Sequence, residues 1–174
     1  MSPTLYFLRS SEQKIASDML FYAYRLDELN KTIDDVDGLA KFYKYYGLTT
    51  KDMGLYALLD NKIAGAVWMR LLEGSDTPVL TIGIKPEFRG QGVGFAMLNQ
   101  LLLEAGAIFD KVSVSVLKDS KAVSFFEKFG FVKANDLDGK STVDGLDTVT
   151  LFKDITKEAV VRPTDGYDPT RWMD

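Results

Sequence analysis

The most chemically informative stretch of the sequence is a run of alternating glycines, Gly90, Gly92 and Gly94, that follows a short apolar segment. That segment, Val79–Ile84, is rich in β-branched residues, as expected of a buried strand. Helical spacing resumes after the glycines, so the sequence predicts a strand, a tight turn and a helix. Main-chain N–H groups at the start of a helix attract anions, and Arg89 adds a guanidinium beside them. The turn is therefore a candidate site for a phosphate or a pyrophosphate.

The common nucleotide-binding motifs do not fit this turn. The dinucleotide fingerprint requires Gly or Ala at its sixth position, which is Phe95 when counted from Gly90 and Met97 when counted from Gly92. The P-loop pattern also fails, because no Gly-Lys-Ser/Thr closes the turn. An alternative interpretation is that the glycines only allow a helix and a strand to pack closely.

Composition limits the chemistry that the chain can perform. Its 174 residues contain neither cysteine nor histidine, which excludes a cysteine acyl-enzyme, a disulfide scaffold and a histidine base. The net charge of −4 and the lack of a long apolar run favour a protein without nucleic-acid or membrane partners. We expect a cytoplasmic protein with no signal peptide and no bound metal. We also expect one domain over residues 1–153, an extended tail over residues 154–174 that carries Trp172, and possible homodimerisation.

Hydrophobic periodicity predicts a mixed α/β domain. Alternating or β-branched runs predict strands at residues 4–8, 53–59, 62–72, 79–84, 111–117, 131–134 and 148–152. Helical spacing predicts helices from residue 10 to about 29, from 34 to 46, from about 91 to 105, and a short one from Asp119 or Ser120 onward. Asp60-Asn61 is a signal for a hairpin turn between two of the strands.

Two motifs in the same order carry a family resemblance. Arg89, Gly92 and Gly94 form Arg-x-x-Gly-x-Gly after the strand, and residues 119–131 read Asp-Ser-Lys-Ala-Val-Ser-Phe-Phe-Glu-Lys-Phe-Gly-Phe. The first closely resembles the pyrophosphate loop of the GNAT family of N-acetyltransferases. The second is similar to that family's Asn-x-x-Ala followed by Tyr-Glu-Lys-x-Gly-Phe. The resemblance covers roughly residues 53–152.

The resemblance implies an α/β (α+β) fold with a mixed, mostly antiparallel sheet of six or seven strands, four flanking helices and a splayed central strand pair. It implies acetyl-coenzyme A as the acyl donor, with the pantetheine arm in the gap between the splayed strands. The residues implied to bind the coenzyme are Ile82, Ile84, Arg89, Gly90, Gln91, Gly92, Val93, Gly94, Asp119 and Phe126.

The sequence departs from the family pattern at two of these positions. Asp119 stands where the family usually has Asn, and an ionised carboxylate accepts hydrogen bonds but cannot donate them. Phe126 stands where the family usually has the Tyr that gives a proton to the departing thiolate. That role is left open to water, to Ser120 or Ser124, or to a tyrosine of the first two helices such as Tyr22 or Tyr24. A catalytically weak acyl-coenzyme A binder, used for sensing or protein interaction, is therefore the alternative to an enzyme.

The expected reaction is direct attack of a primary amine on the thioester, since the chain has no cysteine nucleophile. The amine belongs to a small molecule or a protein N-terminus, and a main-chain N–H near Ile84 stabilises the developing oxyanion. Glu73 and Asp76 are the candidate bases, or else ordinary surface charges of a turn. Acidic residues that the resemblance places on the acceptor side favour a cationic amine, or are merely solvated: Asp27, Glu28, Asp34, Asp35, Asp37 and those of residues 136–147.

Overall fold

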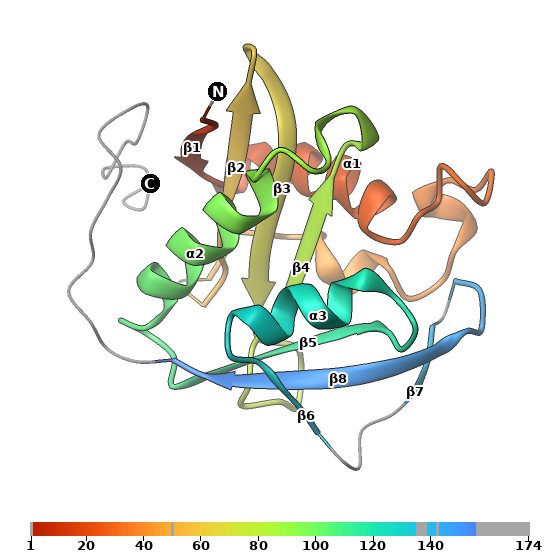
Figure 1. Cartoon of the computed structure of the whole chain (residues 1–174), viewed down its shortest axis with the longest axis vertical. Coiled ribbons are helices and arrows are strands. Elements are labelled where there is room, and N and C mark those ends of the chain that lie inside the picture. The colour runs from red at the N-terminus through yellow and green to blue at the C-terminus, as the bar shows by residue number, and fades with distance from the viewer. Residues whose placement is uncertain (1, 50, 135–138, 142, 156–174) are drawn as a thin grey trace.

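The computed structural model describes residues 2–49, 51–134, 139–141 and 143–155. The described residues form one sheet in the order β1-β2-β3-β4-β5-β8-β6, with the short β7 on β8 (Figure 1). All neighbouring strands are antiparallel except β4 and β5. The strands are β1 (Thr4–Phe7), β2 (Met53–Leu59), β3 (Lys62–Arg70), β4 (Val79–Ile84), β5 (Lys111–Leu117), β6 (Val132–Lys133), β7 (Gly139–Lys140) and β8 (Asp147–Asp154).

Helices cover both faces of this sheet (Figure 1). On one face, α2 (Val93–Ala105) and α3 (Lys121–Lys128) bury Met97, Leu101 and Phe126 in a single apolar cluster. On the other face, α1 (Gln13–Ala23) buries Met19 and Leu20 against Trp68 in a second cluster. The mixed α/β fold and the mostly antiparallel sheet predicted from the sequence are thus confirmed.

The helix α1 lies directly on the backbone of β4. A Cβ placed on Gly83 would stand 2.1 Å from the carbonyl oxygen of Met19, which is far inside van der Waals contact. Glycine at this position therefore allows the helix to approach the strand more closely than any other residue would. This contact fixes the end of α1 next to the central strand.

The hairpin between β2 and β3 forms as predicted. Asp60 and Asn61 both have positive φ angles, 54° and 62°, which is the backbone of a two-residue turn whose twist matches that of the strands. Asn and Asp tolerate this conformation better than other non-glycine residues do. The boundaries predicted for β2, β4 and β5 coincide with the observed ones.

The first helix is shorter than its sequence predicts. It ends at Ala23 rather than near Leu29, because Arg25 adopts the left-handed conformation with a φ of 57°. The N–H of Arg25 donates to the carbonyl of Tyr22, and the N–H of Leu26 donates to that of Phe21. These two bonds are the Schellman termination of a helix, with arginine at the position usually held by glycine. Leu26 is fully buried just after the turn.

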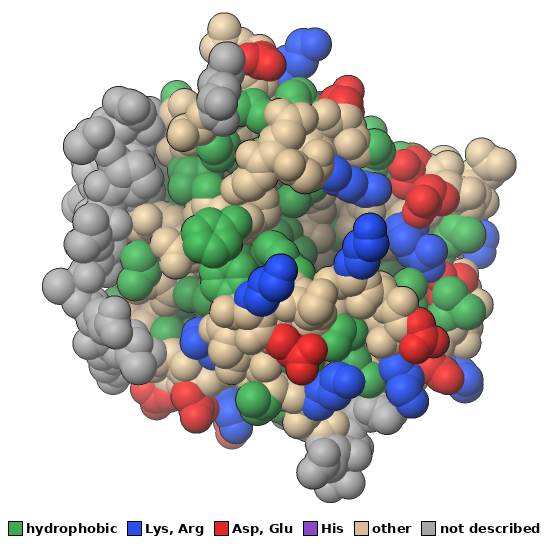
Figure 2. All heavy atoms as spheres, in the orientation of Figure 1, with side chains coloured by type: hydrophobic (Ala, Val, Ile, Leu, Met, Phe, Trp, Pro, Cys, Tyr) green, Lys and Arg blue, Asp and Glu red, His purple; other side chains and the backbone are tan. Residues whose placement is uncertain are grey.

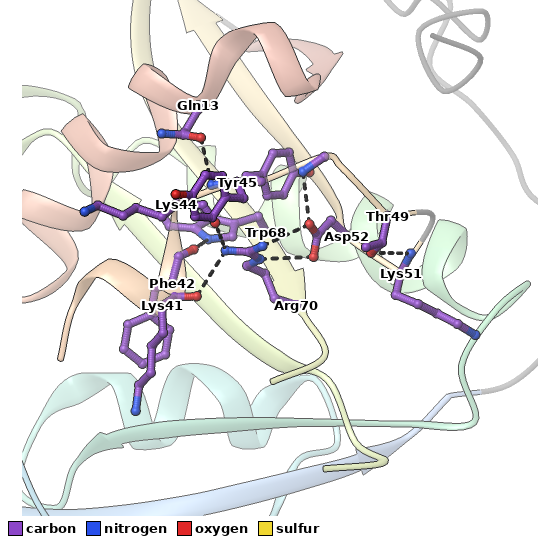
Figure 3. A network of polar contacts seen from close by, with 12 residues as sticks. Gln13, Lys41, Phe42, Lys44, Tyr45, Thr49, Lys51, Asp52, Trp68 and Arg70 are labelled. Carbon is purple, nitrogen blue, oxygen red and sulfur yellow. Dashed lines mark hydrogen bonds and ion pairs between the residues drawn. The ribbon is translucent and has the colours of Figure 1, made fainter. Parts of the chain in front are cut away.

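The second predicted helix, over residues 34–46, is wrong. The described chain has only short 3-10 turns there, at Ile33–Asp35 and Ala40–Phe42, so three α-helices are present where four were expected. The main-chain carbonyls of Lys41, Phe42 and Lys44 accept hydrogen bonds from side chains of β3 instead of from the next turn of a helix. Trp68 Nε1 donates to the carbonyl of Phe42 at 2.7 Å, and Arg70 Nη1 donates to those of Lys41 and Lys44 at 3.1 and 2.6 Å (Figure 3).

Arg70 is itself held in place by Asp52. Its Nε and Nη2 donate to the two carboxylate oxygens at 3.1 and 3.2 Å, while the N–H of Gly47 donates to the same carboxylate at 3.0 Å (Figure 3). The Asp52 side chain is only 4% exposed and the Arg70 side chain 16%. This two-bond ion pair joins the 38–47 segment to the sheet in a largely buried environment.

The C-terminal part of the described chain extends the predicted domain slightly. The strand β8 runs through Asp154, and Ile155 is buried in the main core, so the domain reaches two residues beyond the predicted boundary at 153. The small strand β7 makes eight strands in the described chain instead of six or seven. The predicted tail from residue 156 onward, including Trp172, lies outside the described residues, as do Asp136 and Asp138 of the acidic loop.

The buried pair of Arg70 and Asp52 leads to a prediction about stability. Arg70→Met should lower the free energy of unfolding by about 3 kcal/mol, because Asp52 is left as a buried charge without its cation. Lys14→Met is the control, since it breaks an exposed ion pair with Asp18 and should cost less than about 0.5 kcal/mol. Urea denaturation measures both variants. Equal effects would contradict the anchoring role of Arg70.

Candidate active site

The central parallel strands diverge almost at once. Only Val79 of β4 is in register with Ser113 of β5, and the N–H of Ser113 donates to the carbonyl of Pro78 at 3.0 Å. Within the described residues, the rest of that edge of β4 has no strand beside it (Figure 1). A splayed central strand pair is thus confirmed. Its free main-chain edge offers hydrogen bonds to an extended ligand.

A cleft of about 430 Å³ occupies this gap. The strand β4 contributes Leu80, Thr81 and Ile82 to its walls, and α3 contributes Ala122 and Phe126. Three further segments close one end of the cleft. Their lining residues are Ala23, Tyr24 and Arg25 at the end of α1, Gly38, Lys41 and Phe42 before β2, and Gly139, Lys140, Ser141 and Asp144 around β7.

The glycine turn lies at the far end of β4 and begins α2. Gly90 and Gly92 have positive φ angles of 76° and 82°, and a Cβ at either position would meet nothing within 4 Å. The backbone of the turn is therefore open to a ligand. The first hydrogen bond of α2 is donated by the N–H of Ala96 to the carbonyl of Gly92. The main-chain N–H groups that precede Ala96 in the first turn of the helix are therefore available to an anion.

Arg89 lies at the mouth of the turn with its side chain exposed. Its Nε donates to the carbonyl of Ile84 at 3.1 Å, which fixes the guanidinium at the end of β4. Gly94 serves a different purpose, because a Cβ there would approach Ile84 Cδ1 to 3.0 Å and Ile82 Cδ1 to 3.7 Å. Its small size lets α2 pack onto β4. Gln91 and Val93 complete the turn, the first donating to the carbonyl of Glu87 and the second buried at the start of the helix.

The two positions that depart from the family pattern lie differently. Phe126 is 1% exposed, lines the cleft, and packs edge-on against Phe125 and Phe131 at centroid distances of 5.2 Å. Asp119 is exposed and does not line the cleft. Ser120 directly precedes α3, and its hydroxyl donates a hydrogen bond to the carbonyl of Leu117 at 2.8 Å.

The candidate bases lie outside the cleft. Glu73 and Asp76 are exposed in the turn between β3 and β4, before the strand enters the cleft at Leu80. The structure therefore does not bring them together with the residues at the other end of β4. Their assignment as bases stays a prediction.

Two hydroxyl groups that could replace the missing tyrosine do line the cleft, those of Tyr24 and Ser120. Tyr22 borders a separate surface hollow, and the hydroxyl of Ser124 donates to the carbonyl of Lys121. Burial raises the pKa of Tyr24 to about 12, so its hydroxyl is protonated at neutral pH and is a weaker acid than that of an exposed tyrosine. Its ring lies 5.9 Å from that of Phe42 across the cleft wall.

The acidic residues expected on the acceptor side mostly lie elsewhere. Of the described ones, only Asp144 lines the cleft. Asp35 accepts a hydrogen bond from the N–H of Thr32 at 2.8 Å, and this bond is the main cause of the lowered pKa of its carboxyl. Three further residues of the cleft are basic and were not predicted from the sequence: Arg25, Lys41 and Lys140. No local motif marks these basic residues, because the segments that carry them are far apart in the sequence.

Among the described residues, no group of three His, Cys, Asp or Glu side chains is placed to hold a metal ion. None of the described helices is both long and apolar enough to cross a bilayer.

Comparison with solved structures supports the fold over nearly the whole chain. A GNAT-family acetyltransferase from Streptococcus pneumoniae matches with a TM-score of 0.67 at 20% identity, covering 88% of this chain and 99% of that one. A protein from Salmonella typhimurium assigned as an acetyltransferase, solved with its cofactor acetyl-CoA, matches with a TM-score of 0.70 at 16% identity, covering 93% and 99%. A protein assigned as a phosphinothricin N-acetyltransferase gives 0.70 at 20% identity, covering 89% and 99%.

The sequence itself matches one family model and no curated protein. A search of curated protein sequences gave no significant match. The model of the acetyltransferase (GNAT) domain matches residues 51–133, which include β2 to β5, the glycine turn, α2 and α3. Residues 51–133, a little under half of the chain, therefore match the acetyltransferase (GNAT) domain.

Proposed function

We propose that the protein transfers an acetyl group from acetyl-CoA to a primary amine of a small molecule or a protein N-terminus. The observation that carries this proposal is the unpaired edge of β4, which lines the cleft and leads to the open glycine turn. An extended donor with a pyrophosphate at one end and a reactive thioester at the other fits that arrangement. The neighbour solved with acetyl-CoA supports the same donor.

The two ends of the donor would be held by different means. The main-chain N–H groups of residues 90–94 and the guanidinium of Arg89 would bind the pyrophosphate through charge-assisted hydrogen bonds. The main chain at Ile82 and Ile84 would pair with the amides of the pantetheine arm. Phe126 would supply an apolar wall beside that arm, since it is buried and lines the cleft.

Acetyl transfer would require one proton to leave the amine and one to reach the departing thiolate. The amine nitrogen attacks the thioester carbonyl, the new C–N bond replaces the C–S bond, and the nitrogen loses a proton to water. The thiolate leaves and takes up a proton from Tyr24, which recovers one from solvent. Tyr24 is the candidate for this role because it lines the cleft and carries its proton at neutral pH, although its raised pKa of about 12 makes it a weaker acid than an exposed tyrosine.

A second candidate function is supported by Phe126. The phenyl ring of Phe126 cannot donate a proton. If no other group in the cleft donates one to the thiolate, the protein is a catalytically weak acyl-CoA binder. Release of the coenzyme A thiol in the presence of amines separates the two functions. Turnover favours the transferase, and tight acetyl-CoA binding without turnover favours the binder. Cytoplasmic location and homodimerisation remain predictions from the sequence.

The pyrophosphate site can be tested with a charge reversal. Arg89→Glu should weaken acetyl-CoA binding about 100-fold, because it removes a charge-assisted hydrogen bond and places a carboxylate beside the phosphates. Isothermal titration calorimetry measures the affinity. Lys14→Glu makes the same change of charge at a side chain that is 84% exposed and outside the cleft, and should leave the affinity unchanged. A folded Arg89→Glu protein with wild-type affinity would rule out this site.

The role of Tyr24 can be tested by removing its hydroxyl. Tyr24→Phe should lower kcat about 100-fold with little change in the KM for either substrate, because general-acid catalysis acts on the transition state. An unchanged kcat would assign the proton to water.

Stability at high pH provides an independent test of the burial of Tyr24. The pKa of Tyr24 is higher in the folded state, about 12, than its ordinary value of 10.0. Its contribution to the free energy of unfolding is therefore complete below pH 10 and is lost as the pH rises through 12. Denaturation between pH 9 and pH 12 should show a smaller alkaline loss of stability in Tyr24→Phe than in the wild type. Parallel curves would contradict the burial of this hydroxyl.

A further inference from the structure

The acceptor end of the cleft is built from three segments that are distant in the sequence. Tyr24 and Arg25 come from the end of α1, Lys41 and Phe42 from the 38–42 segment, and Lys140 and Asp144 from around β7. Arg25 Nη2 donates to Asp144 Oδ2, and Lys31 Nζ donates to the carbonyl of Val143 at 3.1 Å. These bonds tie the segment that follows α1 to the segment around β7, on one side of the molecule (Figure 1).

The charged side chains at this end are mainly positive. Among the described residues, three cations line the cleft, Arg25, Lys41 and Lys140, together with one anion, Asp144. The whole chain carries −4, so this concentration of positive charge opposes the average. Figure 2 shows several Lys and Arg side chains around the hollow above α3.

These cations retain capacity to bind an anion. A guanidinium has five N–H donors, and among the described residues Arg25 directs one of them to Asp144. Lys41 has no carboxylate partner in the described chain, and its ammonium lies 5.2 Å from the centre of the Phe42 ring. Lys140 pairs with Asp147 at 2.7 Å, but both side chains are more than 60% exposed, so this pair is weak and easily rearranged.

The backbone that presents Arg25 is strained. With a φ of 57°, Arg25 occupies a left-handed, helix-terminating position that glycine adopts without strain and that other residues adopt only with strain. Such strain is commonly found at sites where a side chain is needed for function. The main chain of Lys41 is also held in place, because Arg70 donates a hydrogen bond to its carbonyl. The side chain of Lys41 points away from that hydrogen bond (Figure 3).

From this arrangement we propose that the acceptor amine also carries a carboxylate, as an α-amino acid does, and that Arg25 and Lys41 bind that carboxylate. This inference rests on the proposed acetyl transfer. Arginine and lysine are the side chains that recognise carboxylates through charge-assisted hydrogen bonds. The same positive end would repel a polycationic amine, since Asp144 is the only described carboxylate that lines the cleft.

Matched acceptors test the proposal. The standard α-amino acids are offered with acetyl-CoA as free acids and as their C-terminal amides, together with spermidine, and release of the coenzyme A thiol is followed. At least one free acid should be acetylated with a kcat/KM about tenfold or more above that of its amide. Acetylation of amides or spermidine as efficiently as of the acids would overturn the proposal. So would acetylation of no free acid by protein that binds acetyl-CoA.

A pair of variants assigns the effect to the cleft. Lys41→Met should raise the KM for the preferred acid about tenfold and leave the KM for its amide and for acetyl-CoA unchanged. Lys44→Met is the control, since Lys44 lies three residues after Lys41, is also exposed, and does not line the cleft. The side chains of Lys41 and Lys44 point in different directions (Figure 3). Equal KM values in Lys41→Met and the wild type would overturn the assignment. If the wild-type protein does not bind acetyl-CoA in calorimetry, the proposed acetyl transfer itself is refuted. Calorimetry therefore distinguishes failure of that proposal from failure of the proposed carboxylate binding.

Discussion

The site depends on the contact between β4 and β5, which is limited to one residue pair. Val79 and Ser113 hold the two strands together at one end, and no further pairing closes the gap beyond them in the described chain. The strand β5 instead pairs along its whole length with β8, from Lys111 to Leu117. A sheet that fails to close at its centre leaves main-chain groups unsatisfied, which is costly unless solvent or a ligand pairs with them. The cleft and the proposed donor site follow from that gap.

The walls of the gap are held by contacts on both faces of the sheet. Gly83 brings the end of α1 onto β4, and Gly94 brings α2 onto the same strand from the other side. The ion pair of Arg70 and Asp52 fixes the 38–47 segment, so that Phe42 and Lys41 line the cleft at the end that we propose for the acceptor. A rigid frame of this kind suits a reaction that depends on positioning two substrates rather than on a covalent intermediate.

Much of the donor half of the site could be predicted from the sequence because its signals are local. The runs of β-branched residues predict the observed first and last residues of β4 and β5. The glycines, Arg89 and the start of α2 are contiguous in the sequence. The acceptor half could not be predicted in the same way. The apolar spacing of residues 34–46 suggests a helix, but the partners of its carbonyls, Trp68 and Arg70, lie on a strand more than twenty residues away. Arg25, Lys41 and Lys140 meet only through the tertiary fold.

The central claim is that the cleft and the glycine turn bind acetyl-CoA, and a thermal melt with and without the saturating ligand tests it most directly. At 100 times its dissociation constant, a ligand that binds only the folded state stabilises it by about 2.7 kcal/mol. For a domain of this size the account predicts a rise in Tm of roughly 5–10 °C. An unchanged Tm in a folded protein would contradict the account and leave the glycine turn with a structural role alone.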